Sequence, residues 1–519
     1  MTSFDCIVIG GGHNGMTAST ILAKSGRKVL LIEASAELGG MGKTIKDFHG
    51  LSMINTINHL NSEVINALEL KKFGFEESKK LLKTISLAEN KEKLIFKGPY
   101  GSDVLGINNS ELQAWLKLRK RLFLQSSVLK KFVNSIPVQE NITFQEKINL
   151  AFTALNLRLK GKDEFQEFFR MVLMCIADIV EETLSSDLLK GLLCFDATLG
   201  IKLGPRSPTS LIGLLYRLSG EVNGHQGGQV FPKGGMDNLI QCFYKSLTQA
   251  GVSSKFNEVV SQIITEDGKA IGVKIASGKE YYAKTILSAV SPIMTFKNLV
   301  GFPKLDTGFV RAINCSRHEG NTSKLLLALN KLPEITDLNS ELLDSRFIFA
   351  PSIETVEKGF NPSKYNQISK NPTFEFTIPS FIDPSLSPSD ISLVSVTIQN
   401  TPYNINESWD KYKSSLQNLV IKKIEHFSPG FSKSIIKSKF LSPMDIENSY
   451  LVPGGHWHHS ELQVDRMYSL RPAFGFADYK SPIEGLYICG AGTHPGGGIS
   501  GSSGLNAARK ILNDQKGRI

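Results

Sequence analysis

The stretch FDCIVIGGGHNGMTAST, residues 4–20, places three consecutive glycines directly after an apolar run and a histidine directly after the glycines. Glycine loses more conformational freedom on folding than any other residue, so a glycine cluster indicates a tight turn or a close approach of the backbone to a ligand. The preceding run, Phe4 to Gly10, is largely apolar and β-branched, which is typical of a buried parallel strand. The residues after the cluster decide between a turn and a ligand site.

A strand–helix–strand unit surrounds these glycines. Gly10, Gly12 and Gly15 form the pattern G-x-G-x-x-G, residues 16–24 have helical spacing, and residues 28–33 (KVLLIE) form a second apolar run. In dinucleotide-binding units the first glycine permits the turn, the second lets the backbone approach a pyrophosphate, and the third lets helix and strand pack closely. Free N–H groups at the start of the helix attract the phosphates. The unit therefore predicts a bound dinucleotide.

The next residues favour FAD over NAD. Glu33 lies 18 residues beyond Gly15, near the position where a carboxylate accepts hydrogen bonds from an adenosine ribose. A second glycine patch, Gly39-Gly40, follows it, as in FAD enzymes related to amine oxidases. No second strand–helix–strand unit with this glycine spacing follows, so a separate NAD(P)H domain is not predicted.

The chain is long enough, at 519 residues, for two domains, and its pattern alternates between them. We predict an α/β fold in which a Rossmann-type FAD-binding domain is interleaved with an α+β substrate domain. The FAD-binding parts are 1–75, 226–299 and 453–519, and the substrate parts are 76–225, mostly helical, and 300–452.

Local patterns predict the elements of the later parts. A helix is expected over 237–249, followed by a β-meander that begins at Val260 and a strand that re-enters the parallel sheet. The substrate parts include a predicted helix over 164–184 and a predicted strand over 392–399. A very glycine-rich loop and a closing helix end the chain.

Five stretches carry a resemblance to a known family. They are VIGGGHNG with LIEASAELGG, FPKGGM, PSFIDPSLSP (379–388), PGGHWHHSELQVDRMYSLRP (453–472) and GLYICGAGTHPGGGISGSSGLNAA. Together they resemble the phytoene-dehydrogenase-like flavoproteins, in particular the branch named after pyridine nucleotide-disulfide oxidoreductase domain-containing protein 2. The wider family includes carotenoid desaturases and isomerases, retinol saturases and, more distantly, amine oxidases. The resemblance runs nearly end to end and implies the FAD-binding fold of the amine oxidase and phytoene desaturase type.

The resemblance also implies non-covalent FAD and a set of contacts. "GGMGKT" lacks the arginine that many relatives place directly after the paired glycines, so Lys43 or the backbone alone would compensate the pyrophosphate charge there, and Met41 is in doubt as a side-chain contact. The implied contacts are Gly10, Gly12, His13, Asn14 and Gly15 at the pyrophosphate, Glu33 with Ala34 at the ribose, Gly39 and Gly40 along the nucleotide, Val260 at the adenine, and Gly490, Gly498 and Ile499 at the ribityl chain and isoalloxazine.

Histidines are the candidates for proton transfer. His494 lies in the glycine-rich loop expected beside the flavin, and His456, His458 and His459 cluster upstream of it. His494 is the predicted catalytic residue, with the alternative that it only hydrogen-bonds to the loop backbone. The cluster lacks carboxylates at metal-ligand spacing, so no metal site is predicted.

Composition excludes several classes of protein. The net charge of +10 is spread over dispersed lysines without an arginine-rich run, which indicates a solvated basic surface and no nucleic-acid partner, while a weak peripheral membrane contact stays open. Six scattered cysteines without a C-x-x-C pair fit a reducing, cytoplasmic setting. No apolar stretch reaches the length of a membrane span.

The sequence patterns predict an FAD-dependent oxidoreductase, and the resemblance implies hydride transfer at a carbon–carbon bond, by desaturation, saturation or isomerisation. Thirty phenylalanines, among them Phe165, Phe168 and Phe169, suggest apolar cavities, and the resemblance implies a small apolar, isoprenoid-like substrate. Two alternatives stay open: an amine oxidase-type flavoenzyme, and a flavin-binding partner protein with little redox activity. The electron acceptor and the oligomeric state are not indicated.

Overall fold

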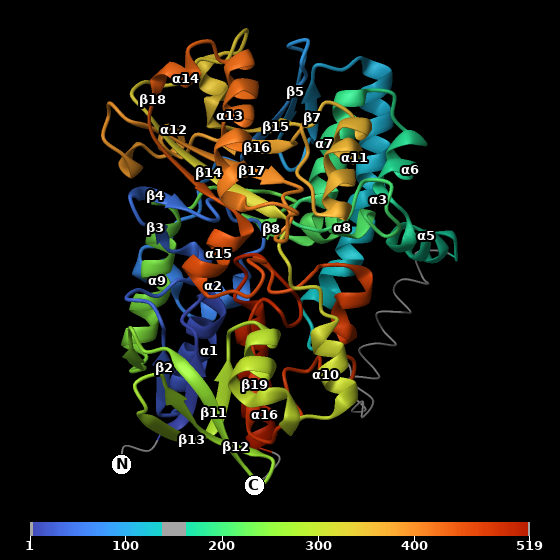
Figure 1. The fold of residues 1–519 in the computed structure, drawn as a ribbon. Coiled ribbons are helices and arrows are strands. Elements are labelled where there is room, and N and C mark those ends of the chain that lie inside the picture. The colour runs from blue at the N-terminus through green and yellow to red at the C-terminus, as the bar shows by residue number, and fades with distance from the viewer. Residues whose placement is uncertain (1–3, 138–161, 517–519) are drawn as a thin grey trace.

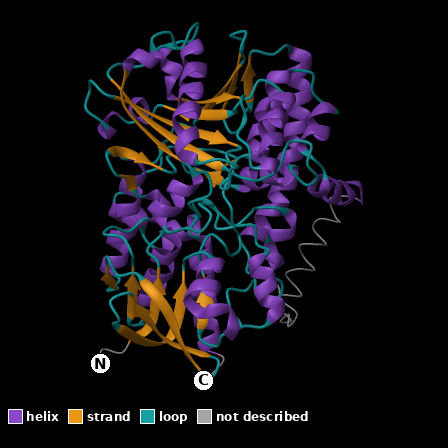
Figure 2. Ribbon diagram, in the orientation of Figure 1, coloured by secondary structure: helices purple, strands orange, loops and turns teal. Residues whose placement is uncertain are grey.

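Two main sheets lie at opposite ends of the molecule in the computed structural model, which describes residues 4–137 and 162–516 (Figure 1). Helices flank both sheets, and Figure 2 shows many loops gathered at the centre of the region between them, with helices on either side. Loops carry binding residues more often than the elements that they connect, so this middle region is where a site is expected.

The first sheet contains the glycine motif. Its strand order is β10-β2-β1-β13-β12-β11, with β19 paired to β13, and the pairs β10–β2, β2–β1, β1–β13 and β13–β19 are parallel. The central strands are therefore parallel, as the Rossmann-type prediction requires, and the antiparallel meander branches from β13 and packs against the face opposite the helices. Its strands are β1 (Phe4–Ile9), β2 (Val29–Ile32), β10 (Ser253–Lys255), β11 (Val260–Glu266), β12 (Lys269–Ile275), β13 (Glu280–Ser288) and β19 (Leu486–Ile488).

Three helices pack on this sheet: α1 (His13–Lys24), α9 (Gly235–Gln249) and α16 (Ser502–Lys516), with α1 lying against the other two. Small residues allow the close packing. A Cβ on Gly15 would come within 2.0 Å of the Gly10 carbonyl oxygen, and a Cβ on Gly504 within 2.1 Å of the Asn14 carbonyl oxygen. The glycine loop is thus held between the sheet and two helices.

The second sheet has the order β18-β14-β17-β16-β15-β5-β6-β7 and is antiparallel except for the β15–β5 pair. The helix α13 (Trp409–Phe427) covers one face through an apolar core. The strands are β5 (Lys83–Leu87), β6 (Lys93–Lys97), β7 (Asp103–Leu105), β14 (Thr322–Leu329), β15 (Ser345–Phe349), β16 (Phe374–Thr377), β17 (Ser392–Gln399) and β18 (Ile435–Leu441).

A helical layer packs beside the second sheet around its own apolar core. Its helices are α3 (Asn109–Val133), α5 (Lys162–Leu173), α6 (Ile176–Glu181), α7 (Asp187–Thr198), α8 (Leu211–Ser219) and α11 (Ile353–Phe360). The remaining short elements are β3 (Thr44–Ile45), β4 (Phe48–Ser52), α2 (Ser62–Ala67), β8 (Glu221–Val222), β9 (His225–Gln226), α10 (Thr307–Asn314), α12 (Pro379–Ile382), α14 (Phe431–Ser434) and α15 (Pro443–Tyr450).

One predicted helix is interrupted. The pattern over 164–184 predicts a continuous helix, but the structure ends α5 at Leu173 and starts α6 at Ile176. The Cys175 Sγ accepts the Asp178 N–H at 3.4 Å and caps α6, and the Ser210 Oγ accepts the Ile176 N–H. Tertiary contacts to the loop before α8 therefore override the local helical periodicity.

The strands of the first sheet come from the three segments assigned to the FAD-binding domain, and those of the second sheet from the two segments assigned to the substrate domain. The domain boundaries themselves stay predictions. Within the described ranges no helix is both long and apolar enough to cross a membrane.

Candidate functional site

A cavity of about 270 Å³ opens at the carboxyl ends of β1 and β2. We call it the glycine-loop cavity. Ligands of open α/β sheets bind at this edge of the strands, beside the start of the first helix. The lining comes from segments far apart in the chain: residues 9–15, 32–43, 258–260, 289–299 and 450–499 each contribute.

The glycines shape this cavity in different ways. A Cβ on Gly12 would meet no atom within 4 Å, so a side chain there would take space beside the cavity that the glycine leaves open. Gly12 also precedes α1 without a side-chain cap, so it leaves the first N–H groups of the helix for another acceptor. Gly39, with a φ of 121°, forms an isolated β-bridge with Gly12 and brings the second glycine patch against the first.

Glu33 joins the end of β2 to the glycine loop. Its Oε2 accepts the Gly11 N–H at 2.7 Å, and its Oε1 accepts the Ser35 N–H at 2.9 Å. A carboxylate has more acceptor positions than these two bonds use, so the residue can still accept a hydrogen bond from a ligand hydroxyl. Glu33 and its neighbour Ala34 both line the cavity.

Buried polar atoms without partners mark the same cavity. The side-chain atoms His13 Nε2, Asn14 Oδ1, Trp457 Nε1 and His459 Nδ1 are buried and make no hydrogen bond, and all four residues line it. Such groups in a folded protein call for a partner, because leaving them unpaired is costly. Burial lowers the pKa of His13 to about 4 and that of His459 to about 3, so both rings are neutral at pH 7. A ligand with the hydrogen-bonding capacity of a dinucleotide would supply partners for this set.

Lys43 supplies a cation at this cavity. Its Nζ donates to the Ser35 Oγ at 2.9 Å and lies 5.3 Å from the centre of the Tyr450 ring. Lys43, Ser35 and Tyr450 all line the cavity. The lysine is therefore placed where the missing arginine after the paired glycines would need a substitute.

Most of the predicted cofactor contacts meet here, although their assignment to parts of FAD stays a prediction. Gly490 is the exception: its Cβ would lie 2.6 Å from the Ala289 carbonyl oxygen, so it allows two backbone segments to approach and does not line the cavity. The predicted residues that do line it are Gly10, Gly12, His13, Asn14, Gly15, Glu33, Ala34, Gly39, Gly40, Val260, Gly498 and Ile499.

Sequence reasoning missed several lining residues. The sequence pattern does not single out Trp457 and marks His459 only as a candidate for proton transfer, although both line the glycine-loop cavity. Tyr450 and Val452 lie in a segment assigned to the substrate domain. The sequence signal for Trp457 and His459 is the unusual run GGHWHH, residues 454–459. Its glycines do not form a nucleotide-binding pattern, so the run by itself does not predict a contact with a nucleotide.

A second cavity of about 190 Å³, which we call the inner cavity, lies between the two sheets. Ile54, Trp457 and Gly498 line both cavities, so the two meet at these residues. Polar and charged side chains dominate the rest of the inner lining. They include Asn55, Thr56, Asn58, His59, Asp196, Tyr216, Arg217, Gln229, Lys324, Glu375, Thr397 and His458.

His494, the predicted catalytic residue, lines neither cavity. Its Nε2 is 2.9 Å from the Phe132 carbonyl oxygen, and its own carbonyl accepts the hydroxyls of Tyr479 and Ser503. Burial lowers the pKa of the ring to about 4. The geometry gives His494 a bracing position in the loop and does not place it where a substrate would react.

The upstream histidines divide between roles. The His456 Nε2 is 3.4 Å from the Glu461 Oε1, and both side chains are buried away from the two cavities. His458 lines the inner cavity with an unpartnered Nδ1, and burial holds its pKa well below the usual range. In residues 4–137 and 162–516, no group of three or more His, Cys, Asp or Glu side chains is arranged to hold a metal ion.

Arg471 supports the loops around both cavities. This fully buried guanidinium donates to backbone carbonyls on two segments, among them His458 and Glu461 on one side and Ala491 on the other. It ties the histidine run to the glycine-rich loop, and so fixes Trp457 and Gly498 relative to each other.

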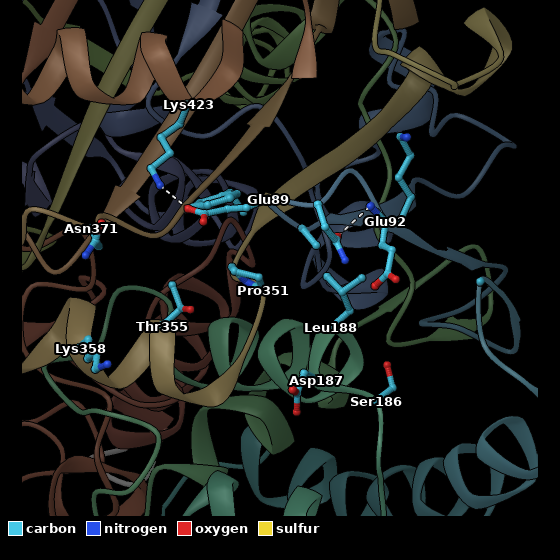
Figure 3. A pocket seen from close by; sticks show the side chains of 15 residues that line it. Glu89, Glu92, Ser186, Asp187, Leu188, Pro351, Thr355, Lys358, Asn371 and Lys423 are labelled. Carbon is cyan, nitrogen blue, oxygen red and sulfur yellow. Dashed lines mark hydrogen bonds and ion pairs between the residues drawn. The ribbon is translucent and has the colours of Figure 1, made fainter. Parts of the chain in front are cut away.

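A wider hollow of about 840 Å³ lies elsewhere and contains none of the predicted residues (Figure 3). It is bordered by the β5–β6 turn, the start of α7, and α11, and its Glu89 is paired with Lys423 of α13 at 2.5 Å. The predicted phenylalanines also lie away from both cavities: Phe168 packs on Phe169, which is 52% exposed. The side-chain environment of Phe165 lies outside the described residues.

Comparison with known proteins gives relatives over the whole chain. Pyridine nucleotide-disulfide oxidoreductase domain-containing protein 2 of Rattus norvegicus is 28% identical over 547 residues, which cover 99% of this chain and 94% of the rat protein. A limonene dehydrogenase subunit from Castellaniella defragrans is 24% identical, with 98% of this chain and 94% of that protein covered.

Among solved structures, a triple mutant of putrescine oxidase has the same fold, with a TM-score of 0.63 at 11% identity, and the match covers 100% of this chain and 99% of that one. The family model described as flavin containing amine oxidoreductase matches residues 15–512. That range includes most of the glycine-loop cavity, whose unpartnered polar atoms fit a dinucleotide. The chain belongs to the family of flavin-containing amine oxidoreductases and is an FAD-dependent oxidoreductase.

Proposed function

We propose that this enzyme binds FAD non-covalently in the glycine-loop cavity and transfers a hydride at a carbon–carbon bond of a small substrate held in the inner cavity. One observation carries the proposal: the two cavities meet at Ile54, Trp457 and Gly498. A cofactor that enters along the glycine loop would reach the substrate only at this junction.

The residues of the first sheet would hold the nucleotide part. Gly12 and the start of α1 offer N–H donors to the phosphates, with Lys43 as the nearby cation. Glu33 offers an acceptor to the ribose, and the buried donors or acceptors of His13 and Asn14 gain partners. Gly498, with a φ of 100°, lets the backbone come close to the ring end without a side chain between them.

When bound, FAD supplies a two-electron centre for hydride transfer. The chain's own residues orient the substrate and exclude water. His59 stacks on Tyr216 with ring centroids 4.8 Å apart, and the Tyr216 hydroxyl donates to the Gly497 carbonyl at 2.8 Å. This pair closes one side of the inner cavity beside the glycine-rich loop.

The polar lining refines the expected substrate. A purely hydrocarbon substrate would leave the buried Lys324 ammonium in the wall of the inner cavity without an ion-pair partner, which disfavours it. We therefore propose a substrate with an apolar reacting part and a polar end. The name of the limonene dehydrogenase relative supports chemistry on a small isoprenoid skeleton.

An amine oxidase-type reaction is the second candidate. The carboxylates of Asp196 and Glu375 and the rings of His59, Tyr216 and Trp457 line the inner cavity, and such groups suit an ammonium ion. Both carboxylates already pair with Arg346, which leaves them less free for a ligand.

Anaerobic flavin reduction tests these functions. The holoenzyme is mixed with a monoterpene alkene, a branched-chain unsaturated acid or a primary alkylamine, and bleaching of the visible flavin band is followed. We expect reduction by the branched-chain unsaturated acid, because it combines an apolar reacting part with a polar end. Reduction by the amine alone would establish the amine oxidase candidate, and fast reduction by NADPH alone would reveal a nicotinamide site that the sequence did not predict.

A further inference from the structure

A row of polar side chains crosses the second sheet and lines the inner cavity. Lys324 on β14 is paired in register with Thr397 on β17, and Thr397 is paired with Glu375 on β16. Side chains alternate between the faces of a strand, so Leu325 and Leu327 enter the core under α13 while Lys324 lies on the opposite face. Strand pairing thus places this row of polar side chains in the wall of the inner cavity.

Lys324 has unused donors in this wall. The side chain is buried, with 5% of the residue exposed, and its Nζ donates one hydrogen bond, to the Thr397 Oγ1 at 3.1 Å. An ammonium group has three donors. Among the described residues no carboxylate oxygen lies within 4 Å of the Nζ, so its charge has no ion-pair partner.

The neighbouring charges are already matched with one another. Arg346 on β15 pairs with Asp196 at 2.7 Å and also with Glu375, and the Arg217 Nε is 3.5 Å from the second oxygen of Asp196. Two carboxylates thus face three cations: Lys324, Arg217 and Arg346. One positive charge in the wall has no counter-charge.

Neutral groups complete the surroundings of Lys324. Burial lowers the pKa of His59 to about 4 and holds the pKa of His458 well below its usual range, so neither ring adds charge at pH 7. A buried ammonium without a counter-ion costs free energy of several kcal/mol at most sites, and its apolar replacement is often stabilising. The fold gains no stability from such an ammonium group, whereas an anionic ligand in the cavity needs it as a counter-ion.

We propose that the inner cavity binds the carboxylate group of the substrate, with Lys324 as its counter-ion and Arg217 as a second donor nearby. The statement that the bound carboxylate belongs to the substrate rests on the proposed function. The anion site itself follows from the geometry of the cavity alone. A single surplus charge matches a monoanion, and a carboxylate accepts from several donors at once. The carboxylate end would be held at the sheet wall, with the reacting part toward Gly498.

Binding of matched aromatic probes to the holoenzyme tests the site. Benzoate, benzamide and benzylamine have one ring and an anionic, a neutral and a cationic end. Calorimetry at pH 7, together with the visible flavin spectrum, should show benzoate binding at least about tenfold more tightly than either of the others. Equal affinities, or preference for benzylamine, would overturn the proposal.

Variants then assign the charge. Lys324→Met should weaken benzoate binding at least about tenfold, and Lys324→Arg should retain most of it. Lys331→Met, an exposed lysine just beyond the same strand, is the matched control and should leave binding unchanged. Flavin content and circular dichroism show whether each variant is folded. If Lys324→Met shifts the flavin potential but not benzoate affinity, the lysine serves the cofactor and the proposal fails.

The outcome is separable from that of the proposed function. Benzoate binding that depends on Lys324, in an enzyme whose flavin no compound in the panel reduces, would keep the anion site and remove the proposed hydride transfer. Flavin reduction by an uncharged alkene, in an enzyme that does not prefer benzoate, would keep the proposed hydride transfer and remove the anion site.

Discussion

The Glu33 Oε2 accepts the backbone N–H of Gly11 at 2.7 Å, so the carboxylate at the end of β2 holds the glycine loop as well as lining its cavity. A side chain in this position acts twice on a bound nucleotide. It offers an acceptor directly, and it fixes the backbone whose N–H groups face the cavity.

Glu33→Arg should therefore weaken FAD binding at least about tenfold, because it removes both acceptor functions and adds bulk and positive charge beside the loop. Flavin content after gel filtration and the dissociation constant from fluorescence titration measure the effect. Glu33→Gln keeps one acceptor oxygen and the shape, and should fall between wild type and Glu33→Arg. Full flavin occupancy in Glu33→Arg would remove Glu33 from the site.

Gly498→Val should give a folded protein with poor FAD retention or a lowered flavin potential. Gly498 has a φ of 100° and lines both cavities, so a branched side chain strains the backbone and narrows the junction, where its Cβ would lie 3.5 Å from the His59 Cβ. Gly278→Val is the matched control, because Gly278 has a φ of 90° in a hairpin turn with open space around it. We expect both variants to lose a similar free energy of unfolding, and only Gly498→Val to lose FAD. Unchanged flavin content, spectrum and potential in Gly498→Val would place the cofactor elsewhere.

His494→Ala should destabilise the fold by roughly 1–3 kcal/mol while FAD stays bound, because the change removes a buried ring together with its hydrogen bond to the Phe132 carbonyl. The free energy of unfolding and the flavin content are the two measurements. Substrate-driven flavin reduction should slow only modestly. A loss of reduction by several orders of magnitude, with normal stability, would restore His494 as a catalytic residue.

The pH dependence of benzoate binding should follow Lys324. Burial lowers the pKa of this ammonium to about 8, and Glu375 opposes the shift. Affinity should be constant below pH 8 and fall as the pH rises through that value, whereas Lys324→Met should show no such fall. The groups around Lys324 are Thr397 and Glu375 on β17 and β16, Arg346 on β15, Asp196 on α7, Arg217 on α8, and the neutral rings of His59 and His458.

The contribution of Lys324 to the free energy of unfolding should change with pH in the direction opposite to that of benzoate affinity. The folded-state pKa of Lys324 lies below its usual value of 10.5, so between about pH 8 and 10.5 the unfolded chain binds more protons and this group's contribution to stability rises with pH. Lys324→Met should thus raise the free energy of unfolding by roughly 1–3 kcal/mol at pH 7, and the gain should shrink toward pH 10. A variant less stable than wild type at pH 7 would show that Lys324 supports the fold.

The glycine-rich part of the glycine-loop cavity follows from the sequence because its determinants are local, whereas the lining from residues 450–459 does not. Gly10, Gly12 and Gly15 act within one strand–helix unit, and the turn, the helix start and Glu33 all lie within a short span of chain. Backbone conformation and short-range packing decide such a unit, so its pattern predicts both the first strands of the sheet and the place of the ligand.

The interrupted helix and the position of His494 could not be predicted in this way. The break before α6 depends on Ser210, and the orientation of His494 on Phe132, each distant in sequence. A glycine-rich loop in the sequence indicates that the backbone comes close to a ligand or to another segment. It does not indicate which side chains of the loop point away from the ligand.

By itself, then, the sequence determined the dinucleotide-binding unit and the family of flavoproteins, since motif, spacing and secondary structure lie together along the chain. Only the tertiary structure decided the charge of the inner cavity. Lys324, Glu375 and Thr397 meet because β14, β17 and β16 are neighbours in the second sheet, and Asp196 and Arg217 reach them from α7 and α8. Strand pairing joins residues with no local pattern in common, and their combined charge exists only once the sheet has formed.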